Sequence, residues 1–321
     1  RLWFVGDFLL RQYTLEDRPT AISTWYPYAL PLDLFLHDSV GRFLMQRLAF
    51  VANDTGRLLG AIDAALLAAL AIAFARVLRL RGVAAAAAAG IVFWGGYLTM
   101  FTGYNKAFAE LPLVMAAVAV SSLHLVREGR RPLLLGLALA LGFVLHRSAL
   151  GLVPVAILTW AHWSRTHPGA WRRPLALAAL ALPVAVLAVL LPRIIGIVTR
   201  IDPMHFTPDE VREAGGMLPG LFIGTRLVDL ANLVPMLSPL ALAAPPMALL
   251  LGRSLPWRAE GVVLATLALP FVVTMPFIHP GQGYYRDWDD FAAAGMTMSL
   301  ATAWLVARTL ERSPRQAWLA L

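Results

Sequence analysis

Long apolar segments constrain the fold of this chain more than any other feature of its sequence. Residues 174–198, for example, contain a single charged residue, Arg193. A helix needs about 20 apolar residues to cross the roughly 30 Å of hydrocarbon in a bilayer. The composition, 59% hydrophobic and 14% charged, lies outside the range of soluble domains. Because the alternating pattern of a membrane β-barrel is absent, the sequence predicts an all-α integral membrane protein, a polytopic helical bundle.

The sequence predicts about nine spans, connected by loops of alternating character. They cover residues 57–78, 83–102, 107–126, 132–145, 149–163, 174–198, 236–252, 261–278 and 291–307. Arginine clusters follow the first, third, fifth, seventh and ninth of these spans, and the positive-inside rule places those loops in the cytoplasm.

Acidic residues gather on the opposite side. Of the 19 acidic residues, only Glu128, Glu260 and Glu311 fall near the predicted inside loops. This division predicts two regions: an outer-face loop with interfacial helices over residues 1–56, and the helical bundle over residues 57–321. A bacterial inner (plasma) membrane, with the site on its extracytoplasmic face, fits this pattern. The chain starts at Arg1 inside a polar segment and stops at Leu321 without an end signal, which predicts missing N- and C-terminal parts.

Several classes of function are excluded. The chain has no cysteine, so disulfides and thiolate metal sites are absent. The net charge of +8 arises from separate arginine clusters without interleaved aromatic residues, so we expect no nucleic-acid partner. The sequence contains no glycine-rich phosphate loop, no zinc-binding HExxH motif and no nucleophile elbow.

Residues 131–165 predict a short helical hairpin with His146 and Arg147 at its tip. Arginines flank both ends, so two limbs of about 15 residues must fit between them. Each limb is too short to reach the far surface, and a buried arginine costs about 2.5 kcal/mol or more unless it is paired or faces a watery cavity. We therefore expect a lipid phosphate as the partner of Arg147. The alternative is one long kinked helix from which Arg147 reaches the interface.

Two further polar stretches are candidate ligand sites. Lys106, the only lysine, lies four residues before Glu110, and the two form either a helix pair or part of a binding site. The stretch HPGQGYYRDWDDF (279–291) places His279, Arg286, Asp287 and Asp289 before the last span. Helix capping and interface anchoring explain part of this stretch, and a ligand site would explain all of it.

The polar stretches together resemble the GT-C superfamily of polytopic membrane glycosyltransferases, in particular mannosyl- and arabinosyl-transferases that depend on polyprenyl-phosphate sugars. The segments that carry the resemblance are GDFLLRQY (6–13), PLDLFLHDSVGRFLMQRLAF (31–50), YNKAFAE (104–110), HRSAL (146–150), DLANLVPMLSPL (229–240) and RDWDDFA (286–292).

The resemblance implies transfer of a sugar from a polyprenyl-phosphate donor to an unidentified acceptor on the outer face. Asp7 matches the position of the catalytic base of the family, although it is also placed to cap the FLLRQY helix. Arg147, Arg286 and Lys106 would neutralise the phosphate. Family members often carry two adjacent acids at the position of the base, whereas here Asp7 stands alone until Glu16 and Asp17. The sequence therefore does not decide whether the site binds a divalent metal, and no other cofactor is expected.

Two other classes of function compete with the transferase. A lipid or solute transporter, such as a flippase, needs polar groups near the midplane and at both gates, often on repeated halves. The inner halves of the predicted spans are almost wholly apolar, and no repeat is visible. A non-catalytic membrane assembly subunit is the other alternative, and it would leave the buried Arg147 without a purpose.

The substitution Asp7→Asn tests the expected base. We predict that it lowers sugar transfer by about 100-fold or more, because positioned general bases contribute at least that factor. Transfer is measured with the purified variant in vesicles, and membrane insertion and thermal stability should match the unsubstituted protein. Full activity in this variant would remove Asp7 from the mechanism.

Overall fold

The computed structural model describes residues 15–16, 29–103, 106–251, 259–280 and 287–312. This described part is helical and contains no strand. Its longer helices are α5 (Ala52–Val77), α6 (Gly82–Phe93), α7 (Leu111–Glu128), α8 (Pro132–Leu145), α9 (Val153–Thr166), α10 (Pro174–Arg200), α14 (Arg226–Leu237), α15 (Ala244–Leu251), α16 (Ala259–Thr274) and α17 (Ala292–Arg312).

Short helices connect the long ones or lie beside their ends. They are α3 (Pro31–Leu34), the π-helix η1 (Phe35–Val40), α4 (Gly41–Leu48), η2 (Gly96–Thr102), η3 (Arg147–Leu152), η4 (Ala170–Arg172), α11 (Pro203–Phe206), α12 (Asp209–Glu213), α13 (Met217–Gly220), η5 (Ala241–Ala243), η6 (Met275–Phe277) and η7 (Trp288–Phe291).

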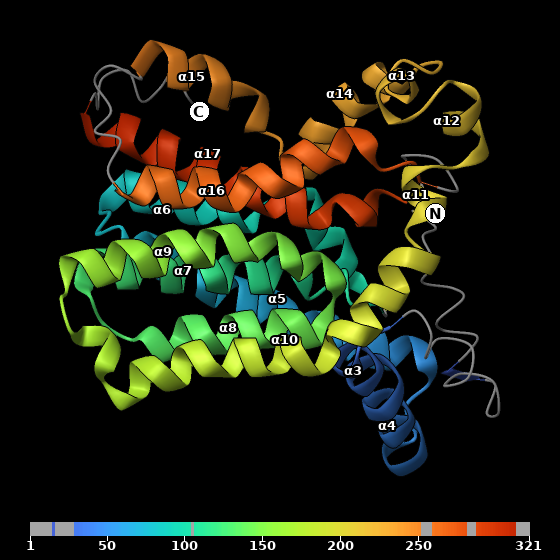
Figure 1. The fold of residues 1–321 in the computed structure, drawn as a ribbon, viewed down its shortest axis with the longest axis horizontal. Coiled ribbons are helices and arrows are strands. Elements are labelled where there is room, and N and C mark those ends of the chain that lie inside the picture. Colours follow the sequence, from blue (N-terminus) through green and yellow to red (C-terminus); the bar gives the residue numbers. More distant parts are fainter. Residues whose placement is uncertain (1–14, 17–28, 104–105, 252–258, 281–286, 313–321) are drawn as a thin grey trace.

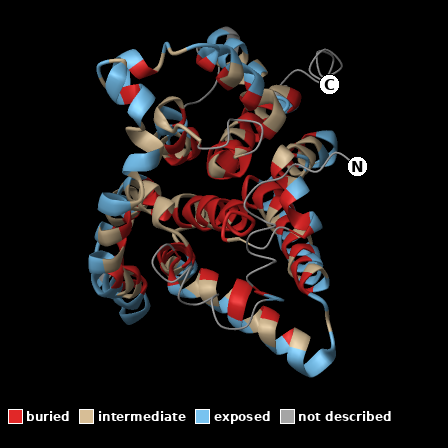
Figure 2. Ribbon diagram, turned by 90° about the vertical axis from the view of Figure 1, so that its right-hand side faces the viewer, coloured by how far each residue is buried: buried red, intermediate tan, exposed pale blue. Residues whose placement is uncertain are grey.

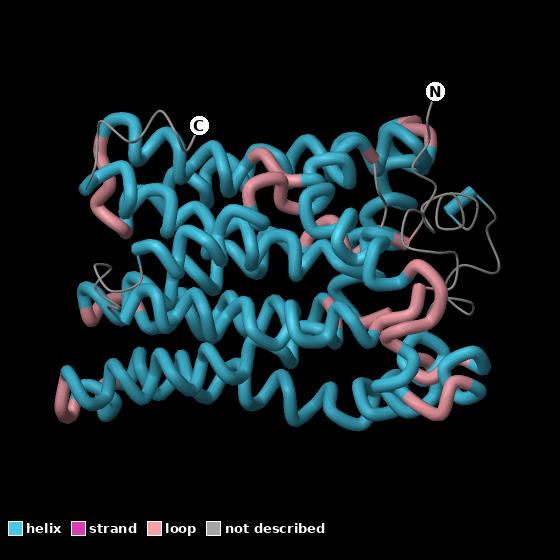
Figure 3. The backbone as a smooth tube through the Cα atoms, turned by 90° about the horizontal axis from the view of Figure 1, so that it is seen from above, coloured by secondary structure: helices cyan, strands magenta, loops and turns pink. Residues whose placement is uncertain are grey.

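Most of the long helices run along one common axis, and most connections lie at the two ends of the bundle (Figures 1 and 3). We call the end that carries α3, α4, η3 and α11 the site end, and the end that carries Glu260 the Glu260 end. Helices α7 and α17 lie in the middle and pack against each other and against α16. Figure 2 shows the buried residues in this centre and the exposed residues around its edge.

The most apolar helices are the most exposed, as expected for helices in contact with lipid. Five helices are long and apolar enough to span a membrane, and up to seven spans result if each bent pair counts as one. The most apolar window belongs to α10 and is 17% buried, whereas the least apolar belongs to the span containing α17 and is 83% buried. A soluble protein shows the reverse order. The helical membrane class is confirmed, but the expected count of about nine spans is not.

Helix breaks account for part of the difference in the number of spans. The chain turns by 59° between α6 and η2 and by 108° between α14 and α15, so these pairs are not straight spans. Helix α8 ends where His146 adopts an extended conformation, with φ −153° and ψ 143°, and α9 then runs back toward the Glu260 end (Figure 1). The predicted hairpin is therefore confirmed, and the single kinked helix is wrong.

Small residues bring the helices close together. Helix α10 packs mainly against α8, and the contact includes the buried residues Ala176 and Ala179. A Cβ atom at Gly136 of α8 would overlap the carbonyl oxygen of Ala179, so only glycine permits this approach. Gly60 of α5 is equally close to the carbonyl oxygen of Phe101 in η2. Such contacts are the usual source of helix association in membranes, where lipid is as apolar as the side chains.

Helices α3 and α4 turn away from the bundle axis at the site end (Figure 1). Across α3, η1 and α4, the apolar residues Phe35, Phe43 and Leu48 are more than half exposed, whereas Asp33 and His37 are buried against the bundle. The polar face is therefore turned inward and the apolar face outward. This arrangement supports the expected interfacial helix, because such helices insert apolar side chains into the bilayer surface.

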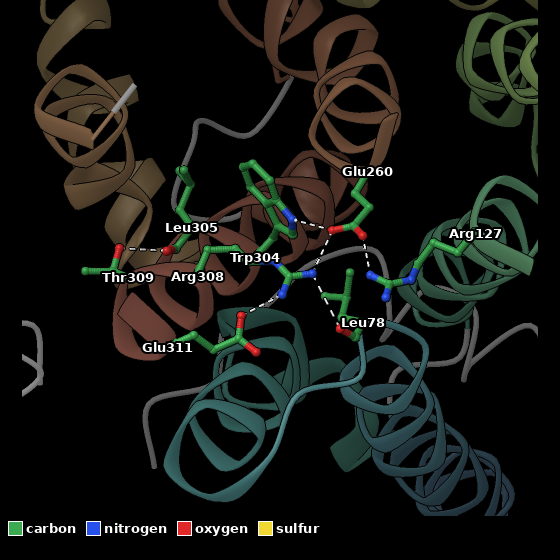
Figure 4. A network of polar contacts seen from close by, with 8 residues as sticks. All are labelled: Leu78, Arg127, Glu260, Trp304, Leu305, Arg308, Thr309 and Glu311. Atoms are coloured by element: carbon green, nitrogen blue, oxygen red, sulfur yellow. Dashed lines mark hydrogen bonds and ion pairs between the residues drawn. The ribbon is translucent and has the colours of Figure 1, made fainter. Parts of the chain in front are cut away.

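An ion-pair network closes the Glu260 end (Figure 4). The buried carboxylate of Glu260 on α16 accepts hydrogen bonds from Arg127 of α7, from Arg308 of α17 at 2.8 Å, and from the indole of Trp304 at 3.2 Å. Arg308 also donates to Glu311 at 2.6 Å. One carboxylate thus joins three helices that are far apart in the sequence.

We predict that Glu260→Gln destabilises the protein by about 3–5 kcal/mol, because two buried guanidinium groups lose their shared counter-charge. The unfolding free energy is measured by denaturant titration in micelles. Glu128→Gln is the matched control, since its carboxylate pairs only with His124 among the described residues. Equal stability of the Glu260 and Glu128 variants would contradict a structural role for the network.

Candidate functional site

The site end contains a cavity of about 250 Å³ that is apolar on most of its wall. We call it the apolar cavity. Its apolar lining includes Leu150, Val198, Phe271 and Ile278. Its polar lining consists of Arg147, Ser148, Asp202, His205, Thr274 and Asp290.

The cavity brings together segments that are distant in the sequence. Phe108 precedes α7, Arg147 follows α8, and Asp290 lies in η7, yet all three line the same space. The hairpin tip and the stretch before the last span therefore share one end of the bundle, as predicted. Asp7 and Arg286, the expected base and one expected phosphate ligand, lie outside the described residues.

Arg147 is paired inside the protein. Its Nε atom donates to an oxygen of Asp202 at 2.8 Å, its Nη2 atom lies 2.6 Å from the same oxygen, and its Nη1 atom lies 3.1 Å from Nε2 of His146. The prediction that Arg147 needs a partner is confirmed, and Asp202 provides one within the protein. A guanidinium carries five N–H groups, so the contacts with Asp202 and His146 among the described residues do not use all of them.

Lys106 and Glu110 do not pair with each other. Residues 107–110 form turns rather than an α-helix, so the spacing of four residues does not bring the two side chains together. Nζ of Lys106 instead lies 3.6 Å from Asp289, a carboxylate that is 2% exposed, and 4.5 Å from the centre of the Phe108 ring. The helix-pair alternative is therefore wrong, and Lys106 links the loop before α7 to η7.

Glu110 belongs to a buried acidic group that the sequence analysis missed. Both oxygens of Glu110 lie 3.0 Å from Nε2 of His37, which is 4.0 Å from Asp33. Asp63 of α5 interacts electrostatically with Glu110 and His37, and its buried Oδ2 atom has no hydrogen-bond partner among the described residues. The sequence did contain a signal for this group: Asp63 is the only acidic residue within the predicted span 57–78, and an acidic residue inside a span usually has a functional role.

His279 is held neutral at the edge of the site end. Its Nδ1 atom accepts a hydrogen bond from Arg226 at 2.8 Å. Burial and, secondly, the charge of Arg226 lower the pKa of His279 to about 4. Burial, followed by the charge of Arg147, also lowers the pKa of His205. The sequence analysis selected His279 but not Arg226. Arg226 is the first residue of an apolar helix and belongs to no recognisable motif.

The remaining expected ligands are arranged around η7. Asp287 precedes η7, and its side chain makes no capping hydrogen bond to that helix. Asp289 is buried beside Lys106, and Asp290 lines the apolar cavity. Asp287 therefore does not cap η7, whereas Asp289 and Asp290 lie in its first turn and face Lys106 and the apolar cavity, respectively.

No metal site is found among the described residues, where no group of three or more His, Asp or Glu side chains is arranged to hold an ion. Comparisons with protein-family models, curated proteins and solved structures find no match for the chain. Its chemistry is therefore argued from this geometry.

The low pKa of His279 predicts a pH-dependent stability. Between about pH 6.5 and pH 4 the unfolded chain binds this proton and the folded chain does not, so the unfolding free energy decreases as the pH falls through this window. His279→Gln should reduce the decrease, whereas His162→Gln, in α9, should leave it unchanged. Thermal melting in micelles at several pH values measures both, and parallel pH profiles for all three proteins would refute the prediction.

Proposed function

We propose that the chain is a membrane glycosyltransferase that takes a sugar from a polyprenyl-phosphate donor. The observation that carries this proposal is the composition of the apolar cavity, in which a hydrocarbon-like wall meets polar groups at one end of a membrane bundle: the guanidinium of Arg147 and the imidazole of His205, beside the carboxylates of Asp202 and Asp290. A donor with a lipid tail and an anionic head needs both surfaces at one interface. The resemblance to GT-C glycosyltransferases adds to this argument.

The paired state of Arg147 is compatible with phosphate binding. A buried cation without a counter-charge would cost several kcal/mol. Asp202 avoids this cost when the cavity holds no donor, and the N–H groups of Arg147 that the described residues do not engage would donate to phosphate oxygens. Leu150, Val198 and Phe271 would contact the first isoprenoid units of the tail.

In the proposed reaction, the acceptor hydroxyl loses its proton to a carboxylate, and its oxygen forms a bond to the anomeric carbon of the sugar. The bond between that carbon and the phosphate oxygen breaks, and polyprenyl phosphate leaves with the electron pair. Asp7 is the base expected from the resemblance. Among the described carboxylates, Asp290 lines the cavity and is the nearest alternative.

A lipid transporter is a second candidate, and one observation favours it. Two helix pairs are bent by 59° and 108°, and broken helices are frequent at transporter binding sites. Vesicles containing the purified protein distinguish the two functions. Movement of a labelled polyprenyl phosphate between leaflets without any glycoside formation would support transport.

We predict that the protein binds undecaprenyl phosphate about tenfold or more tightly than undecaprenol, because hydrogen bonds to a charged group contribute about 1.5–3 kcal/mol. Replacing both members of the buried pair, with Arg147→Gln and Asp202→Asn together, should remove this preference without leaving one charge unpaired. Lipid binding is measured in micelles by native mass spectrometry.

Arg200→Ala is the matched control for this experiment. Arg200 ends α10 at the same end of the bundle, is exposed and does not line the cavity. The control should keep the preference for the phosphate. Equal binding of the two lipids by the unsubstituted protein would refute the proposed donor.

A further inference from the structure

A second pocket, of about 420 Å³, lies at the site end between α12 and α14. We call it the polar pocket. Its polar lining consists of Asp209, Glu210, Thr225, Arg226, Asp229 and His279. Helix α12 lies near α11 at the site end (Figure 1), and α14 packs against α17 and η2.

The two spaces share a thin wall made of two short segments. Met204 and His279 line the polar pocket, whereas their neighbours His205 and Ile278 line the apolar cavity. The backbone N–H of His279 donates to the carbonyl oxygen of His205 at 2.6 Å and joins the segments. A ligand in the polar pocket is therefore separated from a ligand in the cavity by about one layer of residues.

Arg226 fixes this wall in place. The side chain is 5% exposed, and it donates to the carbonyl oxygens of Pro276 and Ile278, the latter at 2.9 Å. It also donates to Nδ1 of His279 at 2.8 Å. Because Nδ1 accepts, the neutral imidazole carries its proton on Nε2, which makes His279 a hydrogen-bond donor on the pocket lining. Arg226 is thus a positioning residue rather than an anion ligand.

The lining of the polar pocket favours hydroxyl groups over anions. Three carboxylates and one guanidinium line it, a net charge of −2 when His279 is neutral. Asp229 accepts from Thr225 at 2.8 Å, Asp209 pairs with Arg212, and Glu210 has no partner among the described residues. Carboxylates that accept several hydrogen bonds, together with a single imidazole donor, suit a hydroxyl-rich ligand and repel a phosphate.

We infer that the polar pocket binds a neutral, hydroxyl-rich acceptor such as a sugar unit. This inference rests on the proposed function, in which the donor head lies in the adjacent apolar cavity. A hydroxyl presented at the edge of the shared wall would then face the anomeric carbon of the donor. Asp229 and Glu210 are the residues that would hold the acceptor.

Saturation-transfer NMR with the full chain in micelles tests this inference. The probe is a mixture of glucose, galactose, mannose, arabinose and N-acetylglucosamine, with inorganic phosphate as the anionic comparison. At least one sugar should bind to the unsubstituted protein, and phosphate should not compete. Glu210→Gln and Asp229→Asn should each weaken that binding about tenfold, the usual effect of losing a hydrogen bond to a charged group.

Glu213→Gln is the matched control, because Glu213 is an exposed residue of the same helix α12 and does not line the pocket. It should bind the sugar normally. Binding of none of the five sugars, or equal weakening in the Glu213 variant, would overturn the inference.

The same experiment separates this inference from the proposed function. Sugar binding that depends on Glu210 and Asp229, in a protein that does not prefer undecaprenyl phosphate, would support the pocket and refute the proposed donor. Preference for undecaprenyl phosphate without sugar binding would support the proposed donor and refute the acceptor site in the polar pocket.

Discussion

The structure depends on the high cost of an unpaired charge in an apolar surrounding. Long helices in a membrane can place charges only where a partner or water is available. At the Glu260 end, one carboxylate serves two guanidinium groups. At the site end, Arg147 pairs with Asp202, and Lys106 with Asp289. The charged groups are thus concentrated at the two ends of the bundle, whereas mainly apolar side chains such as Leu67, Met115 and Leu123 pack between them.

The sequence was sufficient for the features that depend on local patterns. Apolar length predicted the membrane helices, and charges on both sides of two short apolar limbs predicted the break at His146. Pairing between distant segments was not predictable. His37 and Glu110 are 73 residues apart, and Arg147 and Asp202 are 55 apart. A rule based on a spacing of four residues paired Lys106 with Glu110 because the turns before α7 cannot be inferred from composition. The number of spans was uncertain for a related reason, since bends within apolar runs leave no clear sequence signal.

The candidate site combines surfaces that are usually kept apart. The apolar cavity is suited to a lipid tail, the buried group of Asp33, His37, Asp63 and Glu110 concentrates carboxylates, and the polar pocket opens on the other side of a wall held by Arg226. Three long-range contacts join short segments at this end: the hydrogen bond from His279 to His205 at 2.6 Å, the contacts of Arg226 with residues 276–279, and the ion pair of Lys106 with Asp289 at 3.6 Å. These contacts between distant residues therefore hold the short helices and turns of the site end in place.

The network around Glu260 has a consequence for biogenesis. A chain is inserted from its N-terminus onward, and Arg127 precedes Glu260 by 133 residues. While α8, α9 and α10 enter the membrane, the guanidinium of Arg127 has no access to its carboxylate and stays at the water boundary. We therefore expect the ion-pair network to form only after α16 and α17 have brought Glu260 and Arg308 into position.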